Sequence, residues 1–313
     1  MESICCSYSK RRSTSLSSLR LLVTGASGQV GGELLSTLAP LGTVIAPTRS
    51  EMELADPTSV RDFIRERKPD WIVSAGAYTA VDKAESEPDL AFAINAHSVG
   101  VLGEEAKTLG ASVLHYSTDY VFNGEGTTPY VESDPTGPLG VYGASKLAGE
   151  QALLASGASA LIFRTSWVYG ATGKNFLRTI LKYARERPEL RIVADQHGAP
   201  TWSRDLARMA AHVIAQCRTG DKAARLGGIY HAAGSGQTTW AGFAQEAVKQ
   251  LQQREPAMAL ATVTGIATTE YPTPAARPKN SRLNCEKLDL TFGWKMMEWR
   301  ESLRHVLAEL DAS

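Results

Sequence analysis

The sequence lacks several features that would mark a membrane, secreted or nucleic-acid-binding protein. No apolar run approaches the roughly 18 residues that a membrane-spanning helix needs. Lys and Arg number 33 and so do Asp and Glu, so no bulk positive field is present to gather nucleic acid or an anionic membrane. The four cysteines show no metal-ligand spacing, which argues against a zinc site or a disulfide framework. These absences favour a soluble protein of the reducing cytoplasm.

The composition is that of an ordinary globular protein. A chain of 313 residues with 43% hydrophobic and 21% charged residues is long enough for one large α/β domain and a smaller lobe. Residues 1–18 stand apart, because they are rich in Ser and basic residues and contain Glu2 as their only acid. This composition is similar to that of a transit peptide, although a disordered tail or a mis-assigned start explains it as well. We therefore expect residues 1–18 to be a disordered or targeting tail outside the fold.

From Leu19 onward, short apolar runs alternate with stretches of helical period. Continuous apolar strands between helices of ten or more residues are typical of a parallel sheet covered on both faces. Asp56 before Pro57 predicts an N-cap followed by proline in the first helical turn. Strands are predicted at 19–24, 44–46, 71–73, 112–116 and 160–163, and helices at 30–38, 57–67, 88–109 and 142–155.

The fold class that follows is α/β, with a Rossmann-type doubly wound parallel sheet. Beyond residue 170 the alternation is looser, with helices expected at 174–187, at 203–217 and from 239, and a short strand at 228–231. We predict a dinucleotide-binding domain over 19–170 that carries the catalytic residues. Residues 171–313 should form mainly a smaller C-terminal substrate-binding lobe, with some segments returning to the first domain.

A glycine-rich turn follows the first predicted strand. Gly25, Gly28 and Gly31 have the G-x-x-G-x-x-G spacing of short-chain dehydrogenases/reductases. Glycine lets such a turn pack tightly and lets the backbone approach a pyrophosphate at the helix N-terminus, although a plain strand-to-helix turn also uses glycine. After the second strand stands Arg49, which favours NADPH through contact with the 2′-phosphate. If Arg49 is only a solvated surface charge, NADH remains possible.

A phenol and an ammonium stand four residues apart at Tyr142 and Lys146. On a helix this spacing puts both side chains on one face. A cation favours the phenolate of a nearby tyrosine, so Lys146 is expected to lower the pKa of Tyr142 for acid/base catalysis. Thr118 ends the fourth predicted strand, at the sheet edge where ligands bind. These residues predict a ketone reduction in which Tyr142 donates the proton and Thr118 orients the carbonyl.

Several longer segments resemble one family of extended short-chain dehydrogenases/reductases, the dTDP-4-dehydrorhamnose reductases. The resemblance covers nearly everything from Leu19 to the C-terminus. Its segments are GQVG at 28–31, AVDKAE at 80–85, HYSTDYVF at 115–122, FRTSWVY at 163–169, DQHGAPT at 195–201 and RPKNS at 277–281.

The resemblance implies roles for individual residues. Cofactor contacts are expected from the glycine turn with Gln29 and Val30, from Glu53 and Leu54 at the adenosine end, and from Ala77, Tyr78, Thr79, Tyr116 and Lys146 toward the nicotinamide. Substrate contacts are expected from Thr118, Asp119, Trp167 and Arg277, the last with the diphosphate. Trp167 has an alternative interpretation as core packing. Substrate ligation by Asp82, Lys83 and Glu85 is the alternative to their interpretation as a solvated or capping cluster, which we favour. His115 reads as a buried strand residue.

A metal site follows from the resemblance only weakly. Some family members bind magnesium through acids, and Glu33 matches one such position. Arg204, however, stands where a second acid is expected. No metal is therefore predicted.

The implied activity is reduction of the C4 keto group of dTDP-4-dehydro-L-rhamnose to dTDP-L-rhamnose by hydride from NADPH or NADH, the last step of dTDP-rhamnose synthesis. Another nucleotide-sugar reductase or epimerase is the nearest alternative. A non-catalytic subunit similar to the β subunit of methionine adenosyltransferase is the alternative of a different class. The expected partner is a nucleotide sugar, and the protein is expected to be a monomer or homodimer.

Overall fold

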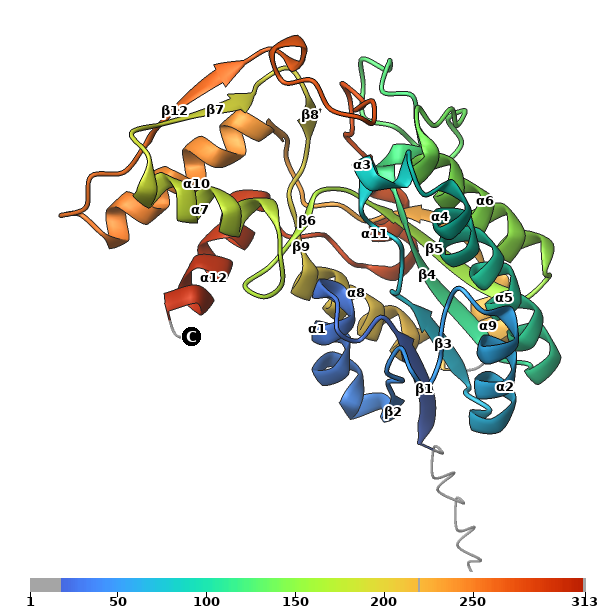
Figure 1. Cartoon of the computed structure of the whole chain (residues 1–313). Coiled ribbons are helices and arrows are strands. Elements are labelled where there is room, and N and C mark those ends of the chain that lie inside the picture. Colours follow the sequence, from blue (N-terminus) through green and yellow to red (C-terminus); the bar gives the residue numbers. More distant parts are fainter. Residues whose placement is uncertain (1–17, 219, 312–313) are drawn as a thin grey trace, which may run out of the picture.

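The computed structural model describes residues 18–218 and 220–311, and its centre is a parallel sheet of six strands (Figure 1). The expected tail therefore lies outside the described residues, apart from Ser18. Every neighbouring pair in this sheet is parallel, which confirms the predicted doubly wound fold. In spatial order the strands are β2 (Gly42–Ile45), β1 (Leu19–Thr24), β3 (Trp71–Ser74), β4 (Ser112–Thr118), β5 (Ser159–Thr165) and β10 (Gly228–His231).

The strand order fixes where a ligand can bind. All four residues of β3 and all seven of β4 are buried, as expected for strands covered on both faces. The chain winds outward from β1 in both directions, to β2 on one side and to β3 on the other. The carboxyl ends of strands at such a switch point leave a crevice.

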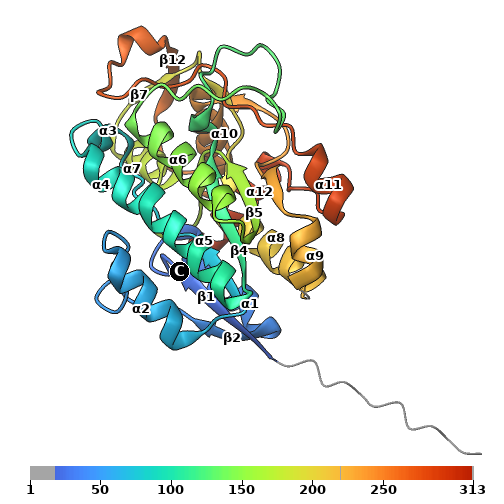
Figure 2. The same ribbon diagram turned by 90° about the vertical axis from the view of Figure 1, so that its right-hand side faces the viewer.

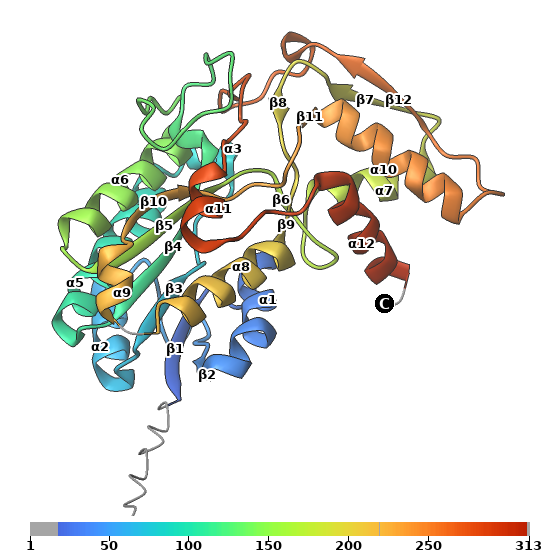
Figure 3. The same cartoon turned by 180° about the vertical axis from the view of Figure 1, so that it is seen from behind.

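Helices cover both faces of the sheet. One apolar cluster joins it to α1 (Gln29–Leu38), α8 (Ser203–Gln216) and α11 (Glu286–Phe292). A second cluster joins it to α2 (Pro57–Arg67), α5 (Ser98–Leu109) and α6 (Val141–Ala155). In Figure 2 the helices α2, α5 and α6 face the viewer, and Figure 3 shows α1 and α8 on the other side of the sheet.

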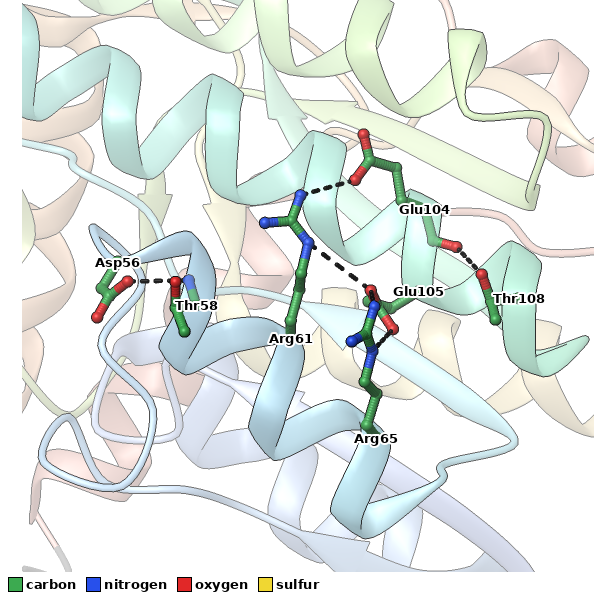
Figure 4. Close-up of polar contacts among 7 residues, drawn as sticks. All are labelled: Asp56, Thr58, Arg61, Arg65, Glu104, Glu105 and Thr108. Atoms are coloured by element: carbon green, nitrogen blue, oxygen red, sulfur yellow. Dashed lines mark hydrogen bonds and ion pairs between the residues drawn. The ribbon is translucent and has the colours of Figure 1, made fainter.

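Ion pairs tie α2 to α5 (Figure 4). The guanidinium of Arg65 donates to both oxygens of Glu105 at 2.8 Å, and Arg61 lies 3.0 Å from Glu104. Glu105 is buried, so its charge needs these partners. At the start of α2, Asp56 accepts a hydrogen bond from the backbone of Thr58 at 2.9 Å, which confirms the predicted cap.

The predicted helix at 88–109 has a different internal structure. It consists of α4 (Pro88–Phe92), a π-helical segment (Ala93–His97) and α5. Asn95 in the wide segment exchanges two hydrogen bonds with the backbone of Tyr78 and donates to Ser145 at 3.0 Å. A Cβ on Gly149 would lie 2.0 Å from the Asn95 carbonyl oxygen. The wide turn therefore accompanies close contact with α6, an arrangement that is common near functional sites.

The C-terminal segments divide between two places. Some pack against the large sheet, namely α8, α9 (Gly220–Arg225), β10 and α11. The others form separate apolar clusters. They are α7 (Phe176–Glu186), β7 (Glu189–Val193), α10 (Trp240–Arg254), β12 (Thr262–Ile266) and α12 (Trp299–Asp311), whose ribbons lie at the left of Figure 1. The boundary near residue 170 stays a prediction.

The remaining elements of the structure are short. They are α3 (Val81–Ala84), β6 (Val168–Tyr169), β8 (His197–Gly198), β9 (Thr201–Trp202), β11 (Thr238–Thr239) and the 3₁₀ turns Ala39–Leu41, Asp119–Val121 and Thr268–Glu270. Among the helices that the structure describes, none combines the length and apolarity needed to cross a membrane.

Candidate active site

A cavity of about 1010 Å³ lies at the carboxyl ends of the strands. It begins at the glycine turn after β1, passes the ends of β3, β4 and β5, and reaches α10 in the C-terminal part. The structure thus brings most of the predicted site residues together. Those that line the cavity are Gly25, Gly28, Gln29, Val30, Arg49, Glu53, Leu54, Ala77, Thr79, Tyr116, Thr118, Asp119, Tyr142, Lys146 and Trp167.

Two glycines shape the turn at one end of the cavity. Gly25 has a positive φ of 67°, and a Cβ there would lie 2.5 Å from the Cα of Gly76. A Cβ on Gly31 would lie 2.0 Å from the Gly25 carbonyl oxygen, so Gly31 packs the turn and does not line the cavity. The helix α1 begins after Gly28 without a side-chain cap. Its first backbone N–H groups are therefore available to an anion.

An exposed ion pair marks the end of the cavity beyond β2. Arg49 Nε lies 2.6 Å from Glu53 Oε2, and the Arg49 side chain is 78% exposed. Glu53 also accepts a hydrogen bond from the backbone of Ala55 at 3.0 Å. That bond and the guanidinium of Arg49 hold the pKa of Glu53 below its ordinary value. Arg49 is thus held beside the cavity by a carboxylate.

The other end of the cavity is buried and carries the acid/base residues. Glu85 accepts a hydrogen bond from the backbone of Val141 at 2.8 Å. It therefore caps the start of α6, which agrees with the capping interpretation of its sequence cluster. One turn of α6 separates Tyr142 from Lys146, and both line the cavity. Lys146 donates to the backbone oxygen of Tyr116 at 2.6 Å.

Burial dominates the ionisation of both groups. It raises the pKa of Tyr142 to about 12, opposed by the hydrogen bond with Thr118. It lowers the pKa of Lys146 to about 8, opposed by the charge of Glu150. The expected lowering of the Tyr142 pKa by Lys146 is therefore not seen, because desolvation and the charge of Asp119 raise this pKa and Thr118 alone opposes them. Near neutral pH the phenol holds its proton, which is the form that an acid needs.

Asp119 carries the buried carboxyl group of the site. Its Oδ1 accepts a hydrogen bond from the Thr118 hydroxyl at 3.1 Å. Its Oδ2 is buried without a hydrogen-bond partner among the described residues. Burial raises the pKa of Asp119 to about 6. A buried acceptor without a partner is costly, so this atom suits a ligand hydroxyl.

An aromatic pair closes the side of the cavity toward the C-terminal part. Trp167 has a positive φ of 47°, and its ring lies 3.7 Å from that of Trp240, nearly parallel. Trp240 and Phe243 of α10 also line the cavity. Sequence reasoning missed both, although two aromatic residues three positions apart share one face of a helix.

Besides Gly31, two predicted contacts do not line the cavity, namely Tyr78 and Arg277. The hydroxyl of Tyr78 donates to Glu87 at 2.7 Å. Arg277 Nη2 lies 2.8 Å from Asp82 Oδ2, so its charge already has a carboxylate partner. Both side chains pair with acids of other segments, which the sequence did not reveal because each pair forms only when the chain folds.

The residues around Glu33 do not fit a divalent cation. Arg204 Nε lies 2.8 Å from Glu33, and the same guanidinium donates to Glu309. The positive charge between the two carboxylates is thus supplied by an arginine. Within residues 18–218 and 220–311, no group of three or more His, Cys, Asp or Glu residues is placed to hold a metal ion.

The fold and the site define a class of protein. A doubly wound sheet, a glycine turn before the first helix, and a Thr, Tyr and Lys set in the same cavity are those of a short-chain dehydrogenase/reductase. A family model described as RmlD substrate binding domain matches residues 19–312. The chain belongs to the dTDP-4-dehydrorhamnose reductase family.

Individual relatives agree with this assignment. The dTDP-4-dehydrorhamnose reductase of Burkholderia thailandensis is 47% identical over 90% of this chain and 96% of its own length. Among solved structures, the dTDP-4-dehydrorhamnose reductase of Clostridium acetobutylicum is 36% identical, with a TM-score of 0.85 over 94% of this chain and 100% of the other. That of Bacillus anthracis in complex with NADP is 34% identical, with a TM-score of 0.85 over 93% and 99%.

Proposed function

We propose that this protein reduces the C4 keto group of dTDP-4-dehydro-L-rhamnose to give dTDP-L-rhamnose, using NADPH or NADH. The observation that carries the proposal is the single cavity that joins the glycine turn to Thr118, Tyr142 and Lys146. Relatives that are 46 to 47% identical bear the name of this reductase. Family membership and the intact acid/base set therefore support the same activity.

The cavity fits a nicotinamide dinucleotide. The backbone N–H groups at the start of α1 suit the pyrophosphate, because no side chain at Gly28 covers them. Leu54 and Glu53 suit the adenosine end, and Ala77 and Thr79 lie between that end and the buried one. When bound, the cofactor supplies the hydride that the reduction requires.

The acid/base residues supply the proton. Tyr142 gives its phenolic proton to the carbonyl oxygen as that oxygen gains charge. The Thr118 hydroxyl donates to Asp119 at 3.1 Å, and it orients the carbonyl oxygen when it turns to donate to that oxygen instead. Lys146, while charged, stabilises the phenolate that remains on Tyr142. No metal is needed for these steps.

The exposed pair at the adenosine end supports use of both cofactors with a preference for NADPH. Arg49 is able to leave Glu53 for a 2′-phosphate, because an exposed ion pair of this kind contributes only about 0–1 kcal/mol. When the 2′-phosphate is absent, Glu53 remains as an acceptor for the ribose hydroxyls. The Bacillus anthracis relative was solved with NADP bound.

The sugar nucleotide is proposed to lie between the acid/base residues and the aromatic pair. Asp119 Oδ2 offers a buried acceptor for a sugar hydroxyl, and the indole of Trp167 offers an apolar face. Arg277 has no such support at present, because Asp82 already pairs with it. Arg277 reaches a diphosphate only if that ion pair opens.

The decisive test is a direct assay. Purified protein with dTDP-4-dehydrorhamnose should consume one NADPH for each dTDP-L-rhamnose formed, and NADH should serve less well. An epimerase would interconvert sugars without net cofactor oxidation. A regulatory subunit would show no turnover with either cofactor. Either of those results would reject the proposed reaction.

Two further properties accompany the proposal. The described cysteines, Cys217 and Cys285, are free thiols, which suits a reducing compartment such as the cytoplasm. We propose a monomer or homodimer, to be decided by sedimentation equilibrium of the purified protein.

A further inference from the structure

A buried histidine contacts the lysine of the active site. His115 in β4 is fully buried, as the sequence predicted, but that prediction gave it no partner. Its Nε2 lies 3.3 Å from Lys146 Nζ. Its Nδ1 lies 3.0 Å from the hydroxyl of Ser74, the residue directly beside it in β3. Lys146, His115 and Ser74 therefore form a continuous hydrogen-bonded chain beneath the cavity.

The chemistry of the lysine sets the direction of this chain. An ammonium group only donates hydrogen bonds, so Nε2 of His115 must be the acceptor. The imidazole proton is then on Nδ1, where it is donated to Ser74. Burial, and then the charge of Lys146, hold the pKa of His115 well below its ordinary value. The imidazole is thus neutral at working pH and able to accept.

We propose that His115 is a positioning residue, whose neutral imidazole holds Lys146 in place and in its charged form during the reduction. This inference rests on the proposed function. Of the three N–H donors of the ammonium, one is taken by the Tyr116 carbonyl at 2.6 Å and one by His115. The third is left for a ligand in the cavity. Ser74 contributes by fixing the tautomer in which Nε2 is free to accept.

Other charged groups near Lys146 do not replace this contact. On α6 itself, Tyr142 is neutral near pH 7, and Glu150 lies one turn beyond the lysine. Glu150 is paired with Arg164 of β5 at 2.7 Å and accepts from Ser117 of β4 at 2.5 Å. Its charge therefore acts on Lys146 from a distance, and no hydrogen bond joins the two in the described chain. The groups of β4 that contact Lys146 are the imidazole of His115 and the carbonyl oxygen of Tyr116.

The test compares two substitutions of different length at the same position. His115→Asn keeps a polar group for Ser74 but is too short to reach Lys146, whereas the amide oxygen of His115→Gln is long enough to accept from it. We expect His115→Asn to move the alkaline limb of the kcat profile down by about one pH unit. At pH values above the limb, kcat should therefore be about tenfold lower than in the unaltered protein. The KM for the sugar nucleotide should stay unchanged. His115→Gln should restore most of the position of the alkaline limb and most of the lost kcat.

A matched control separates this effect from the loss of any buried histidine. His231 in β10 is also fully buried, and its Nδ1 lies 3.0 Å from the Tyr130 carbonyl oxygen, away from Lys146. His231→Asn should leave the kcat profile where it is in the unaltered protein. An unchanged profile in His115→Asn would overturn the inference, as would a His115→Gln variant that is equally impaired or a shift of the same size in His231→Asn.

A second readout does not depend on turnover. In protein labelled with ¹³C at lysine Cε, the Lys146 resonance, assigned by its loss in Lys146→Met, reports the pKa of the amine directly. That pKa should fall by about one unit in His115→Asn and recover in His115→Gln. If the unaltered protein does not reduce dTDP-4-dehydrorhamnose, the proposed function fails, while this titration still decides whether His115 holds the charge of Lys146. An unmoved Lys146 pKa would contradict the inference.

Discussion

The two ends of the cavity are built on opposite principles. At the adenosine end, the side chains of Arg49 and Glu53 are 78% and 35% exposed, so their ion pair is weak and is screened by salt. At the reaction end, Thr118, Asp119 and Lys146 are 5% exposed or less. Burial there moves the pKa of Asp119 up to about 6 and that of Lys146 down to about 8. One end can exchange partners at little cost, whereas the other holds its ionisable groups near the pH at which they work.

The largest effect is expected at the buried end, from loss of the proton donor. Tyr142→Phe removes the phenolic proton while it keeps the ring. We expect kcat to fall by about 10²- to 10⁴-fold, the range of general acid catalysis. Cofactor affinity should be unchanged, because the glycine turn and Arg49 are untouched. Stopped-flow turnover and a fluorescence titration with NADPH measure the two quantities separately.

A second tyrosine serves as the control for Tyr142→Phe. Tyr230 is buried, and its hydroxyl donates to the Leu226 carbonyl oxygen at 2.7 Å, outside the cavity. Tyr230→Phe should keep its turnover. Full activity in Tyr142→Phe would show that another group donates the proton.

The next effect is a pH window set by burial. Lys146 is charged below pH about 8, and its proposed role is to stabilise the Tyr142 phenolate in that form, so the rate of reduction should fall above that pH. Asp119 is ionised above pH about 6, and its proposed role is to accept from a sugar hydroxyl in that form, so kcat/KM should fall below that pH. Asp119→Asn should lower kcat/KM about tenfold and remove the acid limb while the alkaline limb stays. A profile flat from pH 5 to 9 would contradict the role of burial.

Sequence reasoning recovered the parts of the molecule that local patterns determine. The apolar runs predicted all the strands of the first half, and Asp56 and Pro57 marked the start of α2 because capping is a local interaction. The glycine spacing belongs to one strand-to-helix turn, and Tyr142 and Lys146 lie one helical turn apart, so both patterns are also local. The structure brings Gly25, Gly28, Tyr142 and Lys146 to one cavity.

The contacts that sequence reasoning missed join segments far apart in the chain. His115 meets Lys146 across 31 residues, and Trp240 meets Trp167 through packing between the two parts of the molecule. Arg277 was predicted to bind the substrate diphosphate, yet Asp82, 195 residues away, is its partner. The effect of burial on Tyr142 was also missed, since desolvation depends on the finished packing and not on neighbours in sequence.

A smaller effect is expected at the exposed end, where the cofactor preference is set. Arg49→Ala should raise the KM for NADPH about tenfold, the size of one hydrogen-bonded charge contact, and leave the KM for NADH nearly unchanged. The control is Arg61→Ala, because Arg61 pairs with Glu104 between α2 and α5 away from the cavity (Figure 4). Equal loss with both cofactors would mean that Arg49 holds the loop and does not read the 2′-phosphate.

The smallest effect should come from a charged group that belongs to neither end. Arg204 is half-buried between Glu33 and Glu309, and Arg204→Gln leaves these two carboxylates facing each other. We expect the free energy of unfolding to fall by about 1 kcal/mol, with kcat and both cofactor KM values unchanged, whereas Arg204→Lys keeps part of the stability. Because the guanidinium supplies the positive charge, EDTA should not alter the melting temperature of the unaltered protein. A lower melting temperature in EDTA, restored by Mg²⁺, would show that a cation and not Arg204 neutralises this pair.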